Sequence, residues 1–274
     1  MKVIATDLDG TLFYPKDKKN MIYQPNLFVL QNFVDKGGKL VLISGRSVDY
    51  CKKVINKIDR PASIIGFNGS CIYQNDKYIE QNTVPNEDVK NIINETFQAF
   101  KNFGTFIMTD KGVFVHLKTK SKLIRWISKL YYNGQREYAE KFYADEKSFQ
   151  EQLEHGNIYK VLLFFGFSKR KMKKAREANK ILRNTYENFE FSWSTCVIEI
   201  TLKNCNKARS LEDFAKLNNI KKEDIIVVGD SGNDICMFKS FHENSFCMAH
   251  SPKSVSKYAR YTIDKFEDLS RYIY

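Results

Sequence analysis

Residues 2–12 read KVIATDLDGTL, a short apolar run that ends in two aspartates and a glycine. The run Lys2–Thr6 is typical of a buried strand, because it is brief, apolar and β-rich. The residues after it predict a tight turn that carries carboxylates. A second apolar run, Ile225–Val228, leads in the same way into GDSGND at residues 229–234. Two distant strands therefore end in acidic, glycine-rich turns.

The first eighty residues alternate apolar runs with amphipathic segments. Lys39–Ile43 and Ile64–Phe67 are predicted strands, and a helix is predicted to open near Ser47, between them. This β-α-β-α-β order predicts an α/β fold with a parallel sheet covered by helices.

The pattern changes near Val84 and returns near Asn204. Helices and strands between these points do not alternate strictly, which favours a separate α+β unit, and Leu123–Tyr132 is a predicted helix within it. We therefore expect a discontinuous core domain, residues 1–83 and 203–274, and an inserted α+β domain, residues 84–202.

Bulk properties are those of a globular protein, with 43% hydrophobic and 28% charged residues. No apolar run is long enough for a membrane span. Asp7 and Asp9 interrupt what would be the apolar part of a signal peptide, so we expect a cytoplasmic protein with no membrane partner. The six cysteines show no zinc-site spacing, and we expect free thiols.

The formal net charge of +12 favours anionic partners, from nucleic acids to small phosphates. The densest basic run, residues 169–176, begins a predicted helix. Helices routinely carry lysine on the solvent side, and lysine is abundant throughout the chain, so a solvated helix face is favoured over a nucleic-acid footprint. We expect that nucleic acid is not the partner.

Four turns follow predicted strands: residues 7–11, 44–46, 68–69 and 229–234. Ligands of open parallel sheets bind at the carboxyl ends of the strands, so these turns are expected to share one edge. An extended chain would direct the side chains of Asp7 and Asp9 to the same side.

Together with Asp230 and Asp234, these acids would repel one another unless a cation such as Mg²⁺ bound them. Helix capping is the alternative for any one of them. A magnesium site next to a phosphorylated ligand explains the whole set.

DLDGTL at residues 7–12 resembles the first motif of the haloacid dehalogenase (HAD) superfamily. LISGR at residues 42–46 resembles the second, and GDSGNDICMF at residues 229–238 the fourth. The position and size of the insert are similar to those of the large-capped, Cof-like phosphatases. The resemblance implies a Rossmann-like core with an inserted cap domain.

The resemblance also implies residue roles. Asp7 would attack phosphorus and form an aspartyl-phosphate, and Asp9 would act as general acid and then as general base. Mg²⁺ would be held by Asp7, Asp230 and the backbone carbonyl of Asp9. Asp234 and Thr11 would support the site.

The phosphoryl oxygens would be bound by five further groups: the Ser44 hydroxyl, the backbone of Leu8, the backbone of Gly45, the side chain of Asn233 and a lysine. Lys207 matches the lysine of the third motif, although Ala208 stands where members usually have glycine; Lys203 lies a turn too early. The last turn, Phe266–Ser270, departs from the family pattern, which leaves local substrate contacts open. The role of Arg46, helix cap or substrate contact, is open too.

We therefore expect a magnesium-dependent phosphatase that hydrolyses small phosphorylated metabolites, such as sugar phosphates or phosphorylated cofactors, as a monomer or weak homodimer. The alternatives are a sugar phosphomutase, a nucleic-acid-binding protein or nucleic-acid phosphatase, and a silent binding module. The intact acid set argues against a silent module. The sequence does not identify the substrate or the cap residues that select it.

Overall fold

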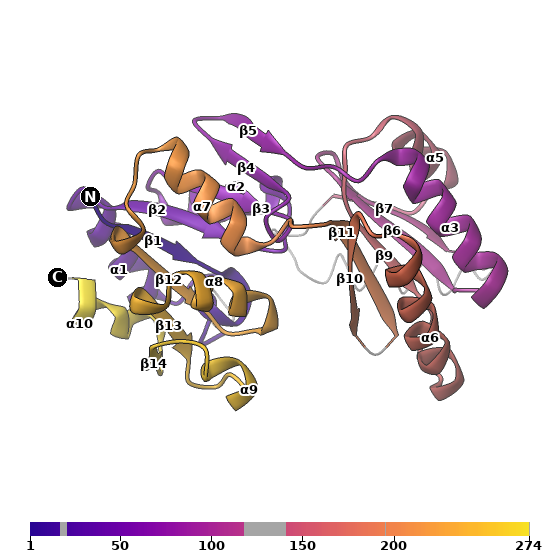
Figure 1. Cartoon of the computed structure of the whole chain (residues 1–274). Helices are drawn as coiled ribbons and strands as arrows, with labels where there is room; N and C mark the ends of the chain where they lie inside the picture. The colour runs from indigo at the N-terminus through magenta and orange to yellow at the C-terminus, as the bar shows by residue number, and fades with distance from the viewer. Residues whose placement is uncertain (17–20, 118–140, 195, 274) are drawn as a thin grey trace. The chain divides into compact units, whose positions relative to one another are not determined.

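The structure is a computed structural model that describes residues 1–16, 21–117, 141–194 and 196–273. The chain forms two compact units (Figure 1). Unit 1 combines residues 1–81 with residues 206–274, and unit 2 comprises residues 82–205. Each unit has its own sheet and its own apolar core.

Unit 1 is built on an eight-stranded sheet in the order β14-β13-β12-β1-β2-β3-β4-β5. The six strands from β14 to β3 are parallel, and the hairpin β4-β5 adds two antiparallel strands at one edge. The bounds are β1 Val3–Thr6, β2 Lys39–Ile43, β3 Ser63–Gly66, β4 Cys71–Gln74, β5 Lys77–Gln81, β12 Ile225–Gly229, β13 Ser245–Met248 and β14 Tyr261–Ile263.

Helices follow these strands in the βαβ manner. The α-helices of unit 1 are α1 Gln24–Asp35, α2 Val48–Ile58, α7 Lys207–Leu217, α8 Ile235–Ser240, α9 Lys253–Ser256 and α10 Ser270–Ile273. Short helical turns complete it: η1 Leu8–Leu12, η3 Lys222–Asp224, η4 Gly232–Asp234, η5 His242–Asn244 and η6 Phe266–Leu269. The sheet and its covering helices can be followed in Figure 1.

Strand β1 occupies the middle of the sheet, between β12 and β2. All four of its residues are buried, which requires cover on both faces. On one face Val3 and Ala5 belong to an apolar cluster that includes Leu211 and Phe214 of α7. The end of β1 is therefore held rigidly at the centre of the carboxyl edge.

Unit 2 is built on a six-stranded sheet in the order β10-β11-β9-β6-β7-β8, antiparallel except for the pair β7-β8. Its strands are β6 Gly104–Thr109, β7 Gly112–Leu117, β8 Phe142–Tyr143, β9 Ile158–Phe164, β10 Phe189–Ser194 and β11 Val197–Leu202. Its helices are α3 Asn86–Phe100, α5 Glu146–His155 and α6 Lys169–Thr185. The predicted helix 123–132 lies outside the described residues.

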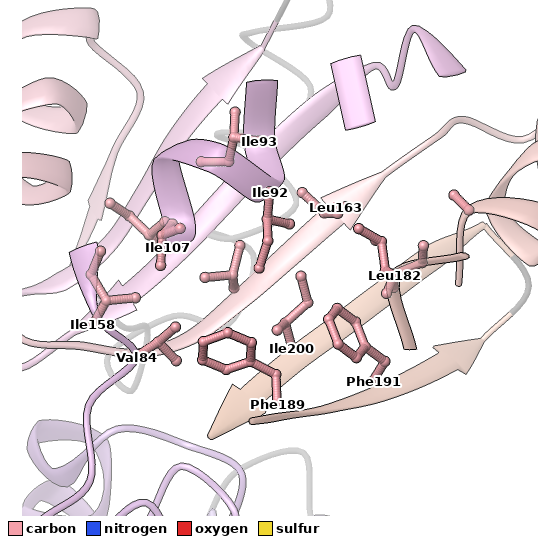
Figure 2. Close-up of a cluster of buried hydrophobic side chains, with 14 of the residues drawn as sticks. Val84, Ile92, Ile93, Ile107, Ile158, Leu163, Leu182, Phe189, Phe191 and Ile200 are labelled. Carbon is pink, nitrogen blue, oxygen red and sulfur yellow. The ribbon is translucent and has the colours of Figure 1, made fainter. Parts of the chain in front are cut away.

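The core of unit 2 lies between its sheet and its helices (Figure 2). Ile92 and Ile93 of α3 and Leu182 of α6 pack on strand residues such as Leu163 and Phe191. The members of this cluster are all apolar, so burial of hydrocarbon surface stabilises it. This second sheet with its helices confirms the predicted fold class, an α/β sheet domain with an α+β insertion.

Among the described residues, no helix has both the length and the apolar composition that a membrane span needs. All six cysteines are free thiols, as the sequence indicated.

Candidate active site

Asp7 is the first residue after the central strand β1. Its backbone N–H donates to the carbonyl of Val228 on β12 (3.0 Å), so the turn starts in register with the neighbouring strand. Only 5% of Asp7 is exposed. A carboxylate at this position is costly to bury unless charged partners lie close to it.

Asp7 forms a compact group with Asp230 and Asp234. One carboxylate oxygen from each residue lies within 4.8 Å of the others. Asp230 follows β12, and Asp234 ends the turn η4, so adjacent parallel strands bring the three together. Gly10 permits this approach: its φ is +82°, and a Cβ there would lie 2.4 Å from Asp230 Oδ2.

Lys207, the first residue of α7, connects two of these acids. Its Nζ donates to Asp7 Oδ1 (2.6 Å) and to Asp234 Oδ1 (2.7 Å). The ammonium group is fully buried, and Asn206 caps the helix by accepting a bond from the backbone N–H of Arg209. The helix start therefore places Lys207 inside the cluster. Lys207 is the lysine that the resemblance assigned to the third motif, in preference to Lys203.

The charges of the cluster are unbalanced. Burial raises the pKa of Asp7 to about 7, with Lys207 opposing the rise and Asp234 adding to it. Burial likewise raises the pKa of Asp230, and Asp234 contributes. Burial would lower the pKa of Lys207, but the carboxylates of Asp234 and Asp7 outweigh it and the pKa is raised. Three carboxylates beside one ammonium leave negative charge that a bound cation would neutralise.

Two of the acids are held by their own hydrogen bonds. Asp234 Oδ2 accepts from the backbone N–H groups of Asp230 and Ser231, each at 3.0 Å. Thr11 Oγ1 donates to Asp230 Oδ1 (3.1 Å). These bonds orient the carboxylates before any ligand binds.

The position of Asp9 differs from the expectation that its carboxylate would converge with those of the other three acids. Its side chain lies outside the group of three and is half exposed. Both of its oxygens accept hydrogen bonds from Arg46, Oδ2 from Nε (2.8 Å) and Oδ1 from Nη2 (3.1 Å). The chain is not extended throughout this turn: Asp7 and Asp9 have extended φ and ψ, but Leu8 between them is helical, so alternation along a strand did not describe it.

The remaining predicted residues lie on the turns after β1, β2 and β12. Ser44 is buried, and its Oγ accepts from the backbone N–H of Arg46 (3.2 Å). Gly45 lies beside Asn68: a Cβ at Gly45 would come within 3.0 Å of Asn68 Oδ1. Asn233 Nδ2 donates to Asn68 Oδ1 (3.1 Å), which links the turns after β3 and β12. The Leu8 side chain is fully buried, which leaves only its backbone for ligand contact.

His250 is a neighbour of the cluster that the sequence did not indicate. Its Nε2 lies 3.8 Å from Asp230 Oδ2, and its ring packs against Tyr14 with centroids 4.2 Å apart. The four histidines share no ligand spacing, so motif search passes over it. Its position two residues after β13, at the carboxyl edge, was the available signal.

Comparison with known proteins identifies the family. The family model for haloacid dehalogenase-like hydrolases matches residues 4–270. A putative phosphatase of Mycoplasma genitalium is 30% identical over 96% of this chain and 91% of its own length. A 5-amino-6-(5-phospho-D-ribitylamino)uracil phosphatase of Bacillus subtilis is 27% identical over 87% of this chain and 85% of its own.

Solved structures agree on the fold. A haloacid dehalogenase-like hydrolase from Bacteroides thetaiotaomicron superposes with a TM-score of 0.81 at 20% identity, covering 100% of this chain and 99% of that one. The chain belongs to the haloacid dehalogenase-like hydrolase family. The family, the hydrolase class and the phosphatase type predicted from the motifs are thereby confirmed.

Proposed function

We propose that the protein is a magnesium-dependent phosphatase that hydrolyses small phosphorylated metabolites through an aspartyl-phosphate on Asp7. The observation that carries the proposal is the buried group of Asp7, Asp230 and Asp234 with Lys207 inside it. A structural ion pair would need one acid for one lysine. Three acids around one lysine leave negative charge that a cation would balance, and the bound cation would then attract the anionic substrate.

The donor set fits Mg²⁺, which prefers hard oxygen ligands and retains waters. Asp7 and Asp230 would hold the ion, with the backbone carbonyl of Asp9 as a third ligand. Asp234 is already bound to Lys207 and to two backbone N–H groups, which suits a supporting role. When bound, the ion would neutralise charge that develops on the transferred phosphoryl group.

Asp7, Asp9 and Lys207 have separate roles in the proposed reaction. A carboxylate oxygen of Asp7 forms a bond to phosphorus as the bond to the leaving oxygen breaks, and Asp9 gives that oxygen a proton. Asp9 then takes a proton from water, whose oxygen displaces Asp7 from phosphorus. Lys207 holds Asp7 in position throughout.

Phosphoryl binding is assigned to the turns around Asp7. The Ser44 hydroxyl, the backbone N–H groups of Leu8 and Gly45, and the Asn233 amide are donors at or near this edge of the sheet. Lys207 completes the set, and Thr11, whose Oγ1 donates to Asp230 Oδ1, supports the site. Backbone donors at such turns are suited to phosphate oxygens because they need no charge of their own.

A small phosphorylated metabolite is the proposed substrate class. The Bacillus subtilis relative acts, by its name, on a phosphorylated ribitylamino-uracil, a compound of this size. The net charge of +12 favours anionic substrates in general. Selection among metabolites is assigned to unit 2, the inserted cap domain.

The test is phosphate release from a panel of phosphorylated metabolites, with Mg²⁺ and with a chelator in its place. We expect hydrolysis of at least one sugar phosphate or phosphorylated cofactor, loss of hydrolysis with chelator, and recovery when Mg²⁺ is returned. Isomer formation without free phosphate would replace the phosphatase with a mutase. Hydrolysis that persists in Asp7→Asn would exclude the aspartyl-phosphate.

A further inference from the structure

Arg46 makes a two-point contact with Asp9, the residue to which the proposed function assigns both proton transfers. The bonds from Nε and Nη2 to the two carboxylate oxygens form the fork geometry that arginine offers and lysine does not. A single bond would leave the carboxylate free to rotate. Two parallel bonds fix the plane of the carboxylate as well as its distance.

Arg46 is itself held from several sides. Its guanidinium lies 4.8 Å from the centroid of the Tyr50 ring, and Tyr50 is buried on α2. Its backbone N–H donates to Ser44 Oγ (3.2 Å), and its carbonyl accepts from the N–H of Phe67 (3.0 Å). The turn after β2 therefore presents a fixed fork to the turn after β1.

Arg46 also explains why Asp9 stays apart from the other three acids. Asp9 follows Asp7 by two residues, yet its carboxylate is not within the group of Asp7, Asp230 and Asp234. The half-exposed pair with Arg46 keeps it at the rim. A carboxylate that served as a metal ligand could not exchange protons freely, so this separation preserves a proton-transfer group beside the cluster.

We infer that Arg46 is a positioning residue, which holds the Asp9 carboxylate in place for proton transfer to the leaving oxygen. The inference rests on the proposed function and deepens it. In the first step the phosphorus–oxygen bond to the leaving group breaks, the bond to Asp7 forms, and a proton carried by Asp9 goes to the departing oxygen, which leaves Asp9 as the carboxylate that the Arg46 fork holds. Displacing Asp9 hinders this transfer and leaves the attack by Asp7 intact.

Two kinds of leaving group separate this role from phosphate binding. A sugar alkoxide is a poor leaving group and needs a proton, whereas p-nitrophenolate leaves without one. Positioned acid catalysis contributes roughly 10²- to 10⁴-fold, so misplacing the acid is expected to lower kcat for a sugar phosphate by about 10- to 100-fold. For p-nitrophenyl phosphate the loss of kcat/KM is expected to stay within about threefold, because kcat/KM reports the steps up to departure of the leaving group and not the later hydrolysis of the aspartyl-phosphate.

The experiment is a double-mutant cycle with Arg46→Lys and Asp9→Asn, in which kcat and KM are measured on both substrates with Mg²⁺. Arg46→Lys keeps the charge and the backbone bonds but removes the fork. For Arg46→Lys we expect a lower kcat on the sugar phosphate and a nearly unchanged KM. When Arg46→Lys is added to the Asp9→Asn variant, we expect little further loss of kcat. Circular dichroism and thermal melting verify that each variant folds.

Arg60→Lys is the matched control. Arg60 makes the same two-point contact with Asp35, at 2.6 and 2.9 Å, and the pair is similarly exposed. The Arg60–Asp35 pair joins the end of α1 to the segment after α2, away from the turns that carry the candidate active site. Its replacement removes an arginine–carboxylate fork of the same kind, and we expect no selective loss on the sugar phosphate.

Three outcomes would overturn the inference. One is an equal loss of kcat/KM on both substrates, and another is a raised KM with kcat unchanged, which would make Arg46 a substrate-binding residue. The third is an effect of Arg46→Lys that is as large in Asp9→Asn as in the parent enzyme. If the parent enzyme released phosphate from neither substrate, the proposed function would fail and the inference with it. Activity in the parent enzyme with any of these three outcomes would overturn the inference alone.

Discussion

The carboxyl edge of the unit 1 sheet and the core of unit 2 are both buried, but by opposite means. At the sheet edge, acids and a lysine lie together out of water. In unit 2 hydrophobic side chains fill the space between the sheet and the helices, as Figure 2 shows for the central residues, and the buried Lys160 is paired with Glu199 (2.9 Å). The first arrangement is costly unless its charges are balanced, whereas the second is favourable by itself.

This difference teaches where function and stability reside in the molecule. Buried charge that the fold does not fully neutralise is available to bind a cation and an anionic substrate. Buried hydrocarbon provides a rigid body but no chemistry. Substitutions in the two regions should therefore differ in whether activity or folding suffers more.

The largest expected effect is on activity, from Asp7→Asn. The amide is close in size to the carboxylate but does not attack phosphorus, so phosphate release should fall by at least about 10⁴-fold. The thermal midpoint should change little, because Lys207 keeps its bond to Asp234. Phosphate assay and circular dichroism check the two parts. A variant that loses activity only by unfolding would contradict the separation of roles.

Lys207→Ala should damage folding as well as activity. It leaves Asp7 and Asp234 buried without their cation, and breaking a buried ion pair costs about 3–5 kcal/mol. Thermal unfolding in chelator measures the loss. Lys216→Ala, on the same helix with an exposed lysine paired to Asp213, is the control and should cost no more than about 1 kcal/mol. Equal effects of the two changes would show that the cluster is not a special environment.

Leu163→Ala should lower stability by about 2–5 kcal/mol, because it opens a cavity in the centre of the unit 2 core. Since the chain has two compact units, chemical denaturation should be fitted with a transition for each. We expect only one transition to shift. Phe28→Ala, whose ring is 68% exposed, should shift neither by more than about 0.5 kcal/mol. A shift of both transitions by Leu163→Ala would mean that the units unfold together.

The smallest effects are expected at helix caps, one in each unit. Asp145 accepts from the backbone N–H of Ser148 (2.8 Å) at the start of α5, and Ser47 accepts from Tyr50 (3.2 Å) at the start of α2. Replacing either cap with alanine should cost about 1 kcal/mol. Chemical denaturation of each variant against the parent protein measures the difference.

The two caps should differ in their response to pH. The backbone hydrogen bond from Ser148 holds the pKa of Asp145 below its ordinary value of 3.8. A carboxylate whose pKa is lowered by folding stabilises the fold above its unfolded pKa and loses this contribution as pH falls through the folded pKa. The effect of Asp145→Ala should therefore be constant near neutral pH and shrink below about 3.8. The effect of Ser47→Ala should not depend on pH, and a parallel decline would contradict this assignment.

Local sequence was sufficient for the acidic turns, whereas their lysine came from the family resemblance. An apolar run followed by DLDG, and another followed by GDSGND, place Asp7, Asp230 and Asp234 at strand ends whatever the details of packing. Parallel pairing of β1 with β12 then brings those ends together. Lys207, the first residue of α7, was assigned only through the resemblance to the third family motif, because a lone lysine at a helix start is otherwise interpreted as solvent-exposed.

Only the tertiary structure decided how the exposed and flanking groups are paired. Asp9 turns to Arg46, Asn233 meets Asn68, and His250 approaches Asp230, each across turns that are far apart in the chain. The sequence by itself determined the family, the two-part α/β architecture and the acids of the site. These depend on periodicity and on residue order, which are local properties of the chain. The pairings depend on turn conformations, such as the positive φ of Asn68 (60°), and on distances between separate loops, which no local pattern records.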